Sequence, residues 1–300
     1  MSRGSSRYIE RVSFGERAVD FGRMIKFSHT VFAMPFALSS ATLAIDGPVP
    51  WPKLGWIVLA MVGARSAAMG FNRLADQEID ARNPRTAARE LPAGRLGRRE
   101  VWTFVLLAAT LLVFAAAMLN PLCLALSPVA LGVVFGYSYT KRFTALSHVV
   151  LGFGLAIAPV GAWLALRGSF AAPPLVLAAA VVLWVAGFDV IYSCQDVAFD
   201  RSSGLHSLPA RLGAARALVV ARAFHVAAVG LLAGLFWLAP LHPVYLVGVA
   251  AVGLLLAYEH SLVRADDLRK VDAAFFTANA WVSVGYFVFT LVAARIVSAT

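Results

Sequence analysis

Nine long apolar runs are the feature that most constrains how this chain can fold. They cover about residues 27–45, 54–75, 102–119, 122–139, 146–166, 175–193, 217–238, 244–262 and 273–297. Most approach or exceed the length of about 20 residues that a helix needs to cross a bilayer. Because the backbone must satisfy its own hydrogen bonds in lipid, such runs fold as helices. The sequence predicts an all-α, polytopic membrane protein, a bundle of nine transmembrane helices whose partner is the lipid bilayer.

Composition supports one membrane domain rather than a soluble enzyme with an anchor. Hydrophobic residues make up 60% of the chain and charged residues 14%, with a mean hydropathy of +0.76, outside the range of soluble globular proteins. We expect an N-terminal segment, 1–26, and a membrane domain, 27–300. Apolar and charged residues alternate over 7–26, which predicts an amphipathic helix on the membrane surface. No short apolar core with a cleavage site precedes the first run, so we expect that run to stay as an anchor.

The basic residues predict an orientation. Most of the 26 Lys and Arg residues lie in the N-terminal segment and in the second, fourth, sixth and eighth connections, whereas the other connections and the C-terminal end hold Lys53, Arg167 and Arg295. The positive-inside rule then places the N-terminus in the cytoplasm and the chain in the inner (cytoplasmic) membrane as a multi-pass protein. The net charge of +10 is spread over short loops, so we expect no nucleic-acid partner.

Two clusters of acidic residues interrupt this apolar pattern at predicted cytoplasmic helix ends. One comprises Asn72, Asp76 and Asp80, and the other comprises Asp189, Tyr192, Asp196 and Asp200, with Gln195 inside the same register. Residues four apart share one face of a helix, so each cluster should form a polar stripe. Acidic residues at such positions are costly and usually mark a functional site.

The two clusters belong to an internal repeat. At a spacing of 120 residues Asp76 aligns with Asp196 and Asp80 with Asp200, and the stretch Leu-Pro-Ala-Gly-Arg-Leu-Gly at 91–97 recurs, one glycine shorter, at 208–213. Repeats in polytopic proteins place a shared site at the interface between the halves. Both clusters should therefore line one central cavity.

These side chains suit a magnesium diphosphate. Carboxylates are ligands for hard divalent cations, and Mg²⁺ typically takes one or two of them while bridging to phosphate oxygens. The predicted metal ligands are Asp76, Asp80, Asp196 and Asp200. Nearby cations suited to clamp a diphosphate are Arg73, Arg82, Arg85, Lys141, Arg142 and Arg201. Tyr139, close to Lys141, is a further candidate for substrate contact.

The two acidic clusters admit other interpretations. Solvated helix ends paired with arginines would explain one cluster, but the duplication favours a site. A secondary transporter, the alternative function, would place its acidic residues near the middle of the bilayer. A CDP-alcohol phosphotransferase would open its motif with Asp-Gly-x-x-Ala-Arg, which is absent here. A structural membrane subunit would not need two matched clusters.

The motifs resemble those of the UbiA-type membrane prenyltransferases over nearly the whole chain. Asn72, Asp76 and Asp80 match the family's first signature, and Asp189, Tyr192, Asp196 and Asp200 match its second. Many members carry an Asp after the Asn, where this chain has Arg73. The stretches 187–196 and 204–209 look most like the quinone-pathway branch, which acts on 4-hydroxybenzoate or a related hydroxynaphthoate.

The resemblance implies a nine-helix bundle whose central cavity is capped on the cytoplasmic side by the second and sixth connections. It implies Mg²⁺-dependent transfer of a polyprenyl group from polyprenyl diphosphate to an aromatic hydroxy acid, in ubiquinone or menaquinone biosynthesis. Haem, chlorophyllide and homogentisate remain alternative acceptors. The implied catalytic residues are Asp76, Asp80, Asp189, Asp196 and Asp200, with Asp189 as the base that removes the ring proton. Asn72, Arg73, Arg82, Tyr139, Lys141, Arg142, Tyr192, Gln195 and Arg201 would bind substrate.

Overall fold

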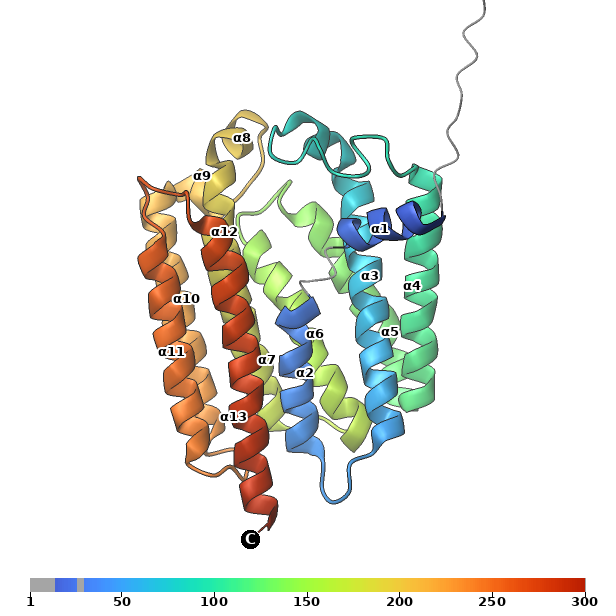
Figure 1. Ribbon diagram of the computed structural model, residues 1–300, viewed down its shortest axis with the longest axis vertical. Helices are drawn as coiled ribbons and strands as arrows, with labels where there is room; N and C mark the ends of the chain where they lie inside the picture. Colours follow the sequence, from blue (N-terminus) through green and yellow to red (C-terminus); the bar gives the residue numbers. More distant parts are fainter. Residues whose placement is uncertain (1–13, 26–29, 300) are drawn as a thin grey trace, which may run out of the picture.

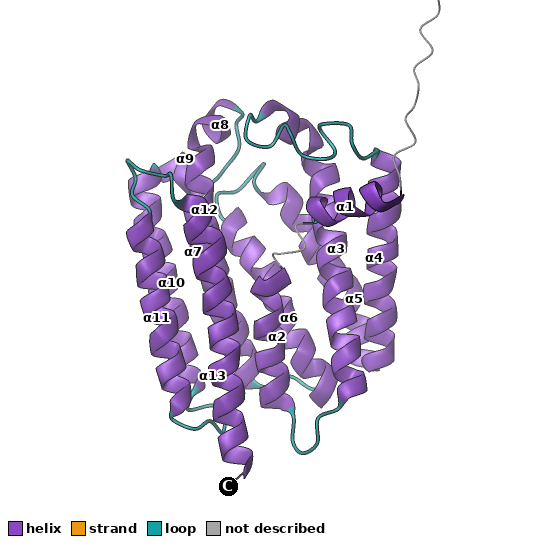
Figure 2. Cartoon of the chain, in the orientation of Figure 1, coloured by secondary structure: helices purple, strands orange, loops and turns teal. Residues whose placement is uncertain are grey.

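The computed structural model describes residues 14–25 and 30–299. Helices account for most of this part of the chain, which contains no strand beyond one isolated bridge between Arg264 and Asp267 (Figure 2). The all-α fold predicted from the apolar runs is therefore confirmed.

Nine helices of the described residues form the bundle. They are α2 (Thr30–Ala44), α3 (Trp51–Arg82), α4 (Arg98–Leu119), α5 (Pro121–Thr140), α6 (Ser147–Arg167), α7 (Ala172–Ser193), α10 (Ala214–Leu235), α11 (Val244–Leu262) and α13 (Asn279–Ala299). Within the described residues, eight helices are long and apolar enough to cross a membrane, and the apolar helix at Phe32–Ala44 is shorter. Residues 27–29, the start of the first predicted span, lie outside the described residues.

The bundle is closed by contacts between consecutive helices. Each of these helices packs against the next one in the chain, and α13 returns to α2. The helices run side by side along the long axis (Figure 1). The connections 83–97, 141–146, 203–207 and 263–270 lie together at one end, which we call the capped end, with the short helices α8 (Val197–Ser202), α9 (Leu208–Leu212) and α12 (Val271–Ala273).

The core centres on α7. Its side chains at Leu177, Val181, Trp184, Val185 and Phe188 are almost fully buried, and the helix packs against α6 and α10. A helix that is hydrophobic all round has no face to give to solvent and belongs in the interior of the fold. The second acidic cluster begins on this helix, so its first carboxylate is anchored in the most buried part of the protein.

The first acidic cluster lies on a single unbroken helix. The apolar run ends near residue 75, and α3, which is 32 residues long, continues past it to Arg82. Asn83 then turns extended (φ −88°, ψ 117°), because the residue before Pro84 is disfavoured in the helical region. Asn72, Asp76 and Asp80 therefore do form the predicted stripe.

The second cluster does not share one helix. After Ser193 the chain tightens into a 3₁₀ turn at Cys194–Asp196, and α8 follows. The prediction of one helical stripe through Asp200 was therefore wrong. A 3₁₀ turn has fewer residues per turn than an α-helix, so it rotates the side chains that follow it relative to α7.

Part of the N-terminal segment forms α1 (Phe14–Met24), which packs beside α3 and α4 (Figure 1). Met24 is fully buried, the ring of Phe21 lies 5.0 Å from that of Phe104, and Arg17 pairs with Glu100. The predicted residues 7–13 and 26 lie outside the described part, and the placement of α1 at the membrane surface stays a prediction.

We expect Gly63→Ala to destabilise the bundle, because the glycine lets α3 approach α4. A Cβ at Gly63 would lie 2.7 Å from the Leu112 nitrogen and 2.8 Å from the Ala108 oxygen, both backbone atoms. Overpacking of this kind costs about 1–3 kcal/mol. The matched control is Gly55→Ala on the same helix, where a Cβ would meet nothing within 4 Å. Thermal unfolding of the detergent-solubilised protein tests this, and equal melting temperatures for the two variants would contradict it.

Candidate active site

A polar cavity of about 170 Å³ opens at the capped end of the bundle, and both acidic clusters line it. Its walls come from α3, α5, α6, α7 and the segments that follow α3 and α7. The structure thus brings the two halves of the repeat together, as the 120-residue spacing predicts. Ten of the sequence-predicted site residues line this cavity: Asn72, Arg73, Asp76, Asp80, Arg85, Lys141, Asp189, Tyr192, Asp196 and Asp200.

Asp76 is the most deeply placed carboxylate of the first cluster, with 2% of its surface exposed. Its Oδ2 accepts hydrogen bonds from Lys141 Nζ at 2.6 Å and from Asn72 Nδ2 at 3.1 Å. Its Oδ1 is buried and has no hydrogen-bond donor, although Arg142 Nη2 lies 3.6 Å away. A buried carboxylate oxygen without a donor is unfavourable, so this oxygen is suited to accept a cation.

Asp196, from the second cluster, is held by the connection that follows α3. Arg85 donates two hydrogen bonds to Asp196, one from Nε to Oδ1 at 2.9 Å and one from Nη2 to Oδ2. Asn83 Nδ2 adds a bond to Oδ1 at 3.1 Å, and Arg85 Nη1 donates to the Tyr192 hydroxyl at 2.9 Å. Burial would lower the pKa of Arg85, but the bonds to Asp196 and Tyr192 raise it above its usual value. The guanidinium therefore stays charged.

In each half, the last carboxylate of the cluster is bound by a residue from the connection that follows it. Arg89 Nη1 donates to both oxygens of Asp80 at 2.7 Å, and Ser207 Oγ donates to Asp200 Oδ2 at 2.7 Å. Arg89 and Ser207 lie just before the repeated Leu-Pro-Ala stretches. The segments just before the repeated stretches thus reach the cavity in both halves, and they contribute a cation, Arg89, in the first half and a hydroxyl, Ser207, in the second.

Asp189 sits deeper along α7 and is oriented by a histidine of α6. Its Oδ2 lies 2.6 Å from His148 Nδ1, and His148 is 3% exposed. The other ring nitrogen, Nε2, accepts the backbone N–H of Leu208 at 3.2 Å. Because Nε2 accepts, Nδ1 carries the proton and donates to Asp189. His148 thereby ties α6, α7 and the segment before α9 to one carboxylate.

Arg73 is buried at the cavity wall with 4% of its surface exposed. Its Nη1 lies 3.5 Å from Asn72 Oδ1, and its Nε has no hydrogen-bond partner among the described residues. The residue that departs from the family pattern therefore faces the same cavity as the carboxylates, as a cation with donors left over.

Five predicted residues do not line the cavity: Arg82, Tyr139, Arg142, Gln195 and Arg201. Arg82 and Gln195 bond to backbone carbonyls of their own segments, and Arg201 bonds to the Ala210 carbonyl. Tyr139 is 42% exposed, with the Arg142 guanidinium 4.9 Å from its ring centre. Arg142 still reaches the first cluster, since its Nη2 lies 3.6 Å from Asp76 Oδ1. Nearness in sequence to a cluster was not enough to place these side chains inside.

Sequence reasoning did not assign a site role to Asn83, Arg89, His148 or Ser207. Three of them lie in connections, whose course over the cavity follows from tertiary folding. The repeat offered a signal for Arg89 and Ser207, because both precede the repeated stretch. His148 carried no such signal, since its partner Asp189 lies 41 residues away on another helix.

The donor set fits a magnesium ion that arrives with its substrate. Within the described residues no three His, Cys, Asp or Glu side chains converge into a complete metal site. Mg²⁺ usually takes only one or two carboxylates and fills its remaining positions with water and phosphate oxygens. The cavity offers oxygen ligands of this kind. They are Oδ1 of Asp76 and the carboxylates of Asp80, Asp196 and Asp200.

Comparison with known proteins gives the same answer as the motifs. The model of the UbiA prenyltransferase family matches residues 33–283. The 4-hydroxybenzoate octaprenyltransferase of Thiobacillus denitrificans is 34% identical over 251 residues, which cover 82% of this chain and 83% of that protein. The enzyme of the same name from Saccharophagus degradans is 31% identical over 258 residues, 85% of each chain.

Solved structures share the fold. A UbiA homologue from Aeropyrum pernix K1, in its apo form, superposes with a TM-score of 0.80 at 36% identity and covers 88% of this chain and 97% of its own. A UbiA homologue from Archaeoglobus fulgidus, bound to DMAPP and Mg²⁺, gives a TM-score of 0.74 at 17% identity, covering 92% and 99%, a likeness of fold alone. The motifs, the shared cavity and these matches agree: the chain belongs to the UbiA prenyltransferase family and is a membrane-embedded prenyltransferase.

Proposed function

We propose that the protein transfers a polyprenyl group from polyprenyl diphosphate to an aromatic hydroxy acid, with 4-hydroxybenzoate as the favoured acceptor, in quinone biosynthesis. The observation that carries the proposal is one cavity lined by carboxylates from both halves of the repeat and by cations suited to phosphate. The curated relatives described above are named for transfer to 4-hydroxybenzoate. A hydroxynaphthoate is the nearest alternative acceptor.

Arginine and lysine side chains of the cavity now pair with carboxylates. The diphosphate of the donor would take the place of those carboxylates. Arg85, Arg89 and Lys141 now bond to Asp196, Asp80 and Asp76. Arginine binds phosphate oxygens through two parallel N–H bonds as readily as it binds carboxylates. When the donor enters, these side chains would bond to its phosphate oxygens, and Arg73 adds a buried cation beside them.

Asp76, Asp80, Asp196 and Asp200 would hold magnesium in this arrangement. A bound ion would neutralise the diphosphate as the allylic carbon–oxygen bond breaks. Homologues solved with prenyl diphosphates and Mg²⁺ support this assignment by likeness of fold. The connections 83–97 and 203–207 would hold the cavity closed and exclude water from the reacting carbon.

An aromatic wall continues from the polar cavity toward the core. The ring of Phe275 lies 4.3 Å from that of Tyr192, which lines the cavity, and 5.2 Å from that of Phe188. Aromatic faces attract cations and these apolar side chains exclude water. We assign this wall to the isoprenoid part of the donor, so that the allylic cation would meet the acceptor ring and not water.

Asp189 is the proposed base. It lines the cavity from α7, before the segment that carries Asp196 and Asp200. His148 bonds to one of its carboxylate oxygens, which leaves the other oxygen for the acceptor. A carboxylate there can accept the proton that the aromatic ring loses once the new carbon–carbon bond has formed. His148 acts through Asp189 and is a positioning residue.

A transporter is the less favoured function. The site is built where α3 and α7 end, at the capped end, and intramembrane transport sites lie near the middle of the bilayer. The basic connections gather at this same end, which supports a cytoplasmic capped end and a chain inserted in the inner membrane.

The acceptor can be identified directly. Purified protein in lipid, given geranyl diphosphate, Mg²⁺ and a panel of 4-hydroxybenzoate, a hydroxynaphthoate and homogentisate, should yield prenylated 4-hydroxybenzoate, detected by its mass. Excess chelator should abolish the product and added Mg²⁺ should restore it. Full activity in chelator would contradict the metal assignment, and prenylation of another acceptor alone would overturn the choice of 4-hydroxybenzoate.

We expect Asp76→Asn and Asp196→Asn each to lower turnover at least 100-fold, the order of loss when one electrostatic contributor is removed from an active site. Each removes a charge needed to hold the ion but keeps the side-chain volume. Asp46→Asn is the control, because Asp46 is 75% exposed and pairs with Arg167 at the opposite end of the bundle. Turnover of geranyl diphosphate measures the effect, and wild-type rates in the Asp76 or Asp196 variant would refute the assignment.

Replacing His148 should affect the rate more than binding of the donor. We expect His148→Ala to lower kcat about tenfold with the KM for the donor little changed, since outer contacts of this type contribute 10- to 100-fold in comparable sites. His148→Gln should recover part of the rate, because its amide can donate to Asp189. His242→Ala, in an exposed loop at the far end, should behave as wild type. A raised KM with unchanged kcat would argue against a positioning role.

A further inference from the structure

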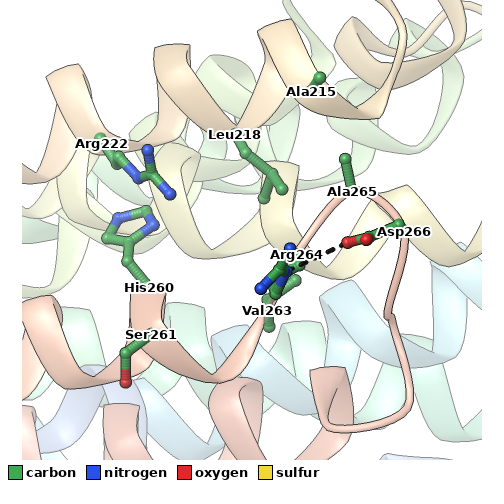
Figure 3. A pocket seen from close by; sticks show the side chains of 9 residues that line it. All are labelled: Ala215, Leu218, Arg222, His260, Ser261, Val263, Arg264, Ala265 and Asp266. Atoms are coloured by element: carbon green, nitrogen blue, oxygen red, sulfur yellow. Dashed lines mark hydrogen bonds and ion pairs between the residues drawn. The ribbon is translucent and has the colours of Figure 1, made fainter.

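A second pocket lies outside the active site, at the capped end between α10 and α11. It has a volume of about 440 Å³ and is lined by residues at the start of α10, the end of α11 and the loop after α11 (Figure 3). Neither α7 nor any residue of the acidic clusters lines it. The chemistry of the active site therefore does not account for the charged and polar side chains of this second pocket.

The charge in this pocket is unbalanced. Of the residues that line it one is acidic, Asp266, and its Oδ1 already accepts Arg264 Nε at 3.2 Å. No hydrogen bond or ion pair joins the exposed side chain of Arg222 to another described residue. Helix α10 contains no acidic residue, and the one acidic residue of α11, Glu259, is fully buried and accepts from Asn279 at 3.0 Å. The pocket thus holds no anion that pairs with Arg222.

The unpaired arginine sits within a membrane-spanning helix. Arg222 is eight residues into α10, about 12 Å along the axis at 1.5 Å per residue. A charge at that depth is unfavourable unless the side chain reaches toward the interface or binds an anion. Figure 3 shows Arg222 directed over the ring of His260 and toward the space in front of Arg264.

The wall opposite Arg222 is held rigidly. His260 Nε2 lies 3.0 Å from His225 Nδ1, and His225 Nε2 lies 3.2 Å from the Trp184 carbonyl oxygen. A carbonyl only accepts, so His225 donates from Nε2 and His260 donates to its Nδ1. The His260 ring is therefore fixed through His225 to α7, and the pocket keeps its shape without an occupant.

The surface beside the pocket is apolar and exposed. Val219 and Val226, three residues before and four after Arg222, share its face of α10 and are 59% and 73% exposed. On α11, Leu254 and Tyr258 are 72% and 58% exposed. A basic pocket at the interface that continues into an exposed apolar face matches a molecule with an anionic head and apolar tails.

We propose that this pocket binds the phosphate headgroup of an anionic phospholipid, with Arg222 as its principal ion pair and Arg264 and Ser261 at its rim. The acyl chains lie along the Val219 and Val226 face. A second lipid anion, the prenyl diphosphate donor, shares the phosphate chemistry. The pocket is assigned to phospholipid because it offers one unpaired arginine and no cluster of carboxylates for the metal ions that a diphosphate brings.

Native mass spectrometry of the whole protein tests this site. With phosphatidylglycerol as the probe, we expect one retained lipid per chain, and with phosphatidylcholine none. Arg222→Gln should weaken retention of phosphatidylglycerol at least tenfold. Arg99→Gln, which removes an exposed arginine from the start of α4 at the same end, should retain it like wild type.

A second variant keeps the charge and fills the space. Ala215→Trp should block phosphatidylglycerol even though Arg222 remains, and melting temperatures near wild type would show that both variants fold. Equal retention of phosphatidylglycerol by wild type and Arg222→Gln would overturn the proposal. Arg222-dependent retention of geranyl diphosphate in place of phosphatidylglycerol would overturn it as well. Loss of prenyl transfer in the Asp76 variants bears on the other cavity only, so the two proposals can fail separately.

Discussion

Ion pairs that cross the polar cavity are the interaction on which the site and the cap both depend. Arg85 of the first connection bonds to Asp196 of the second half, and Lys141, after α5, bonds to Asp76 on α3. Buried carboxylates are strongly unfavourable without such partners. Because the cations come from segments outside the long helices, the connections are held over the cavity by the same charges that they neutralise. The capped end therefore closes the bundle and forms the site at once.

These pairs also explain how a small cavity can serve a large substrate. The space of about 170 Å³ is below the 300–1,000 Å³ usual for ligand pockets, because guanidinium and ammonium groups fill the room between the carboxylates. A bound diphosphate would pair with the arginine and lysine side chains, and the metal ions that accompany it would pair with the carboxylates. The charge balance is then kept while the cavity widens.

The two halves of the repeat are matched in position but not in charge. Asp80 is held by Arg89, whereas Asp200 is held by the Ser207 hydroxyl. The hydroxyl donates a hydrogen bond to its carboxylate but brings no positive charge, whereas the guanidinium brings both. Arg73, in place of the acidic residue common in the family, adds a buried cation on the first half. The two halves therefore bring matching carboxylates to the cavity but surround them with different charges.

The sequence by itself determined the membrane class, most span positions, the two clusters and their meeting in one cavity, because apolar length, four-residue spacing and a 120-residue repeat are local or periodic properties. It did not determine the continuation of α3 to Arg82, the 3₁₀ turn before α8, or the placement of Arg201 and Tyr139 outside the cavity. Only the tertiary structure decided that Arg85, Arg89, His148 and Ser207 hold the carboxylates. The reason is physical: a side chain in a connection takes its partner from whatever the folded helices bring near it, and that neighbour can lie, as with Arg85 and Asp196, 111 residues away.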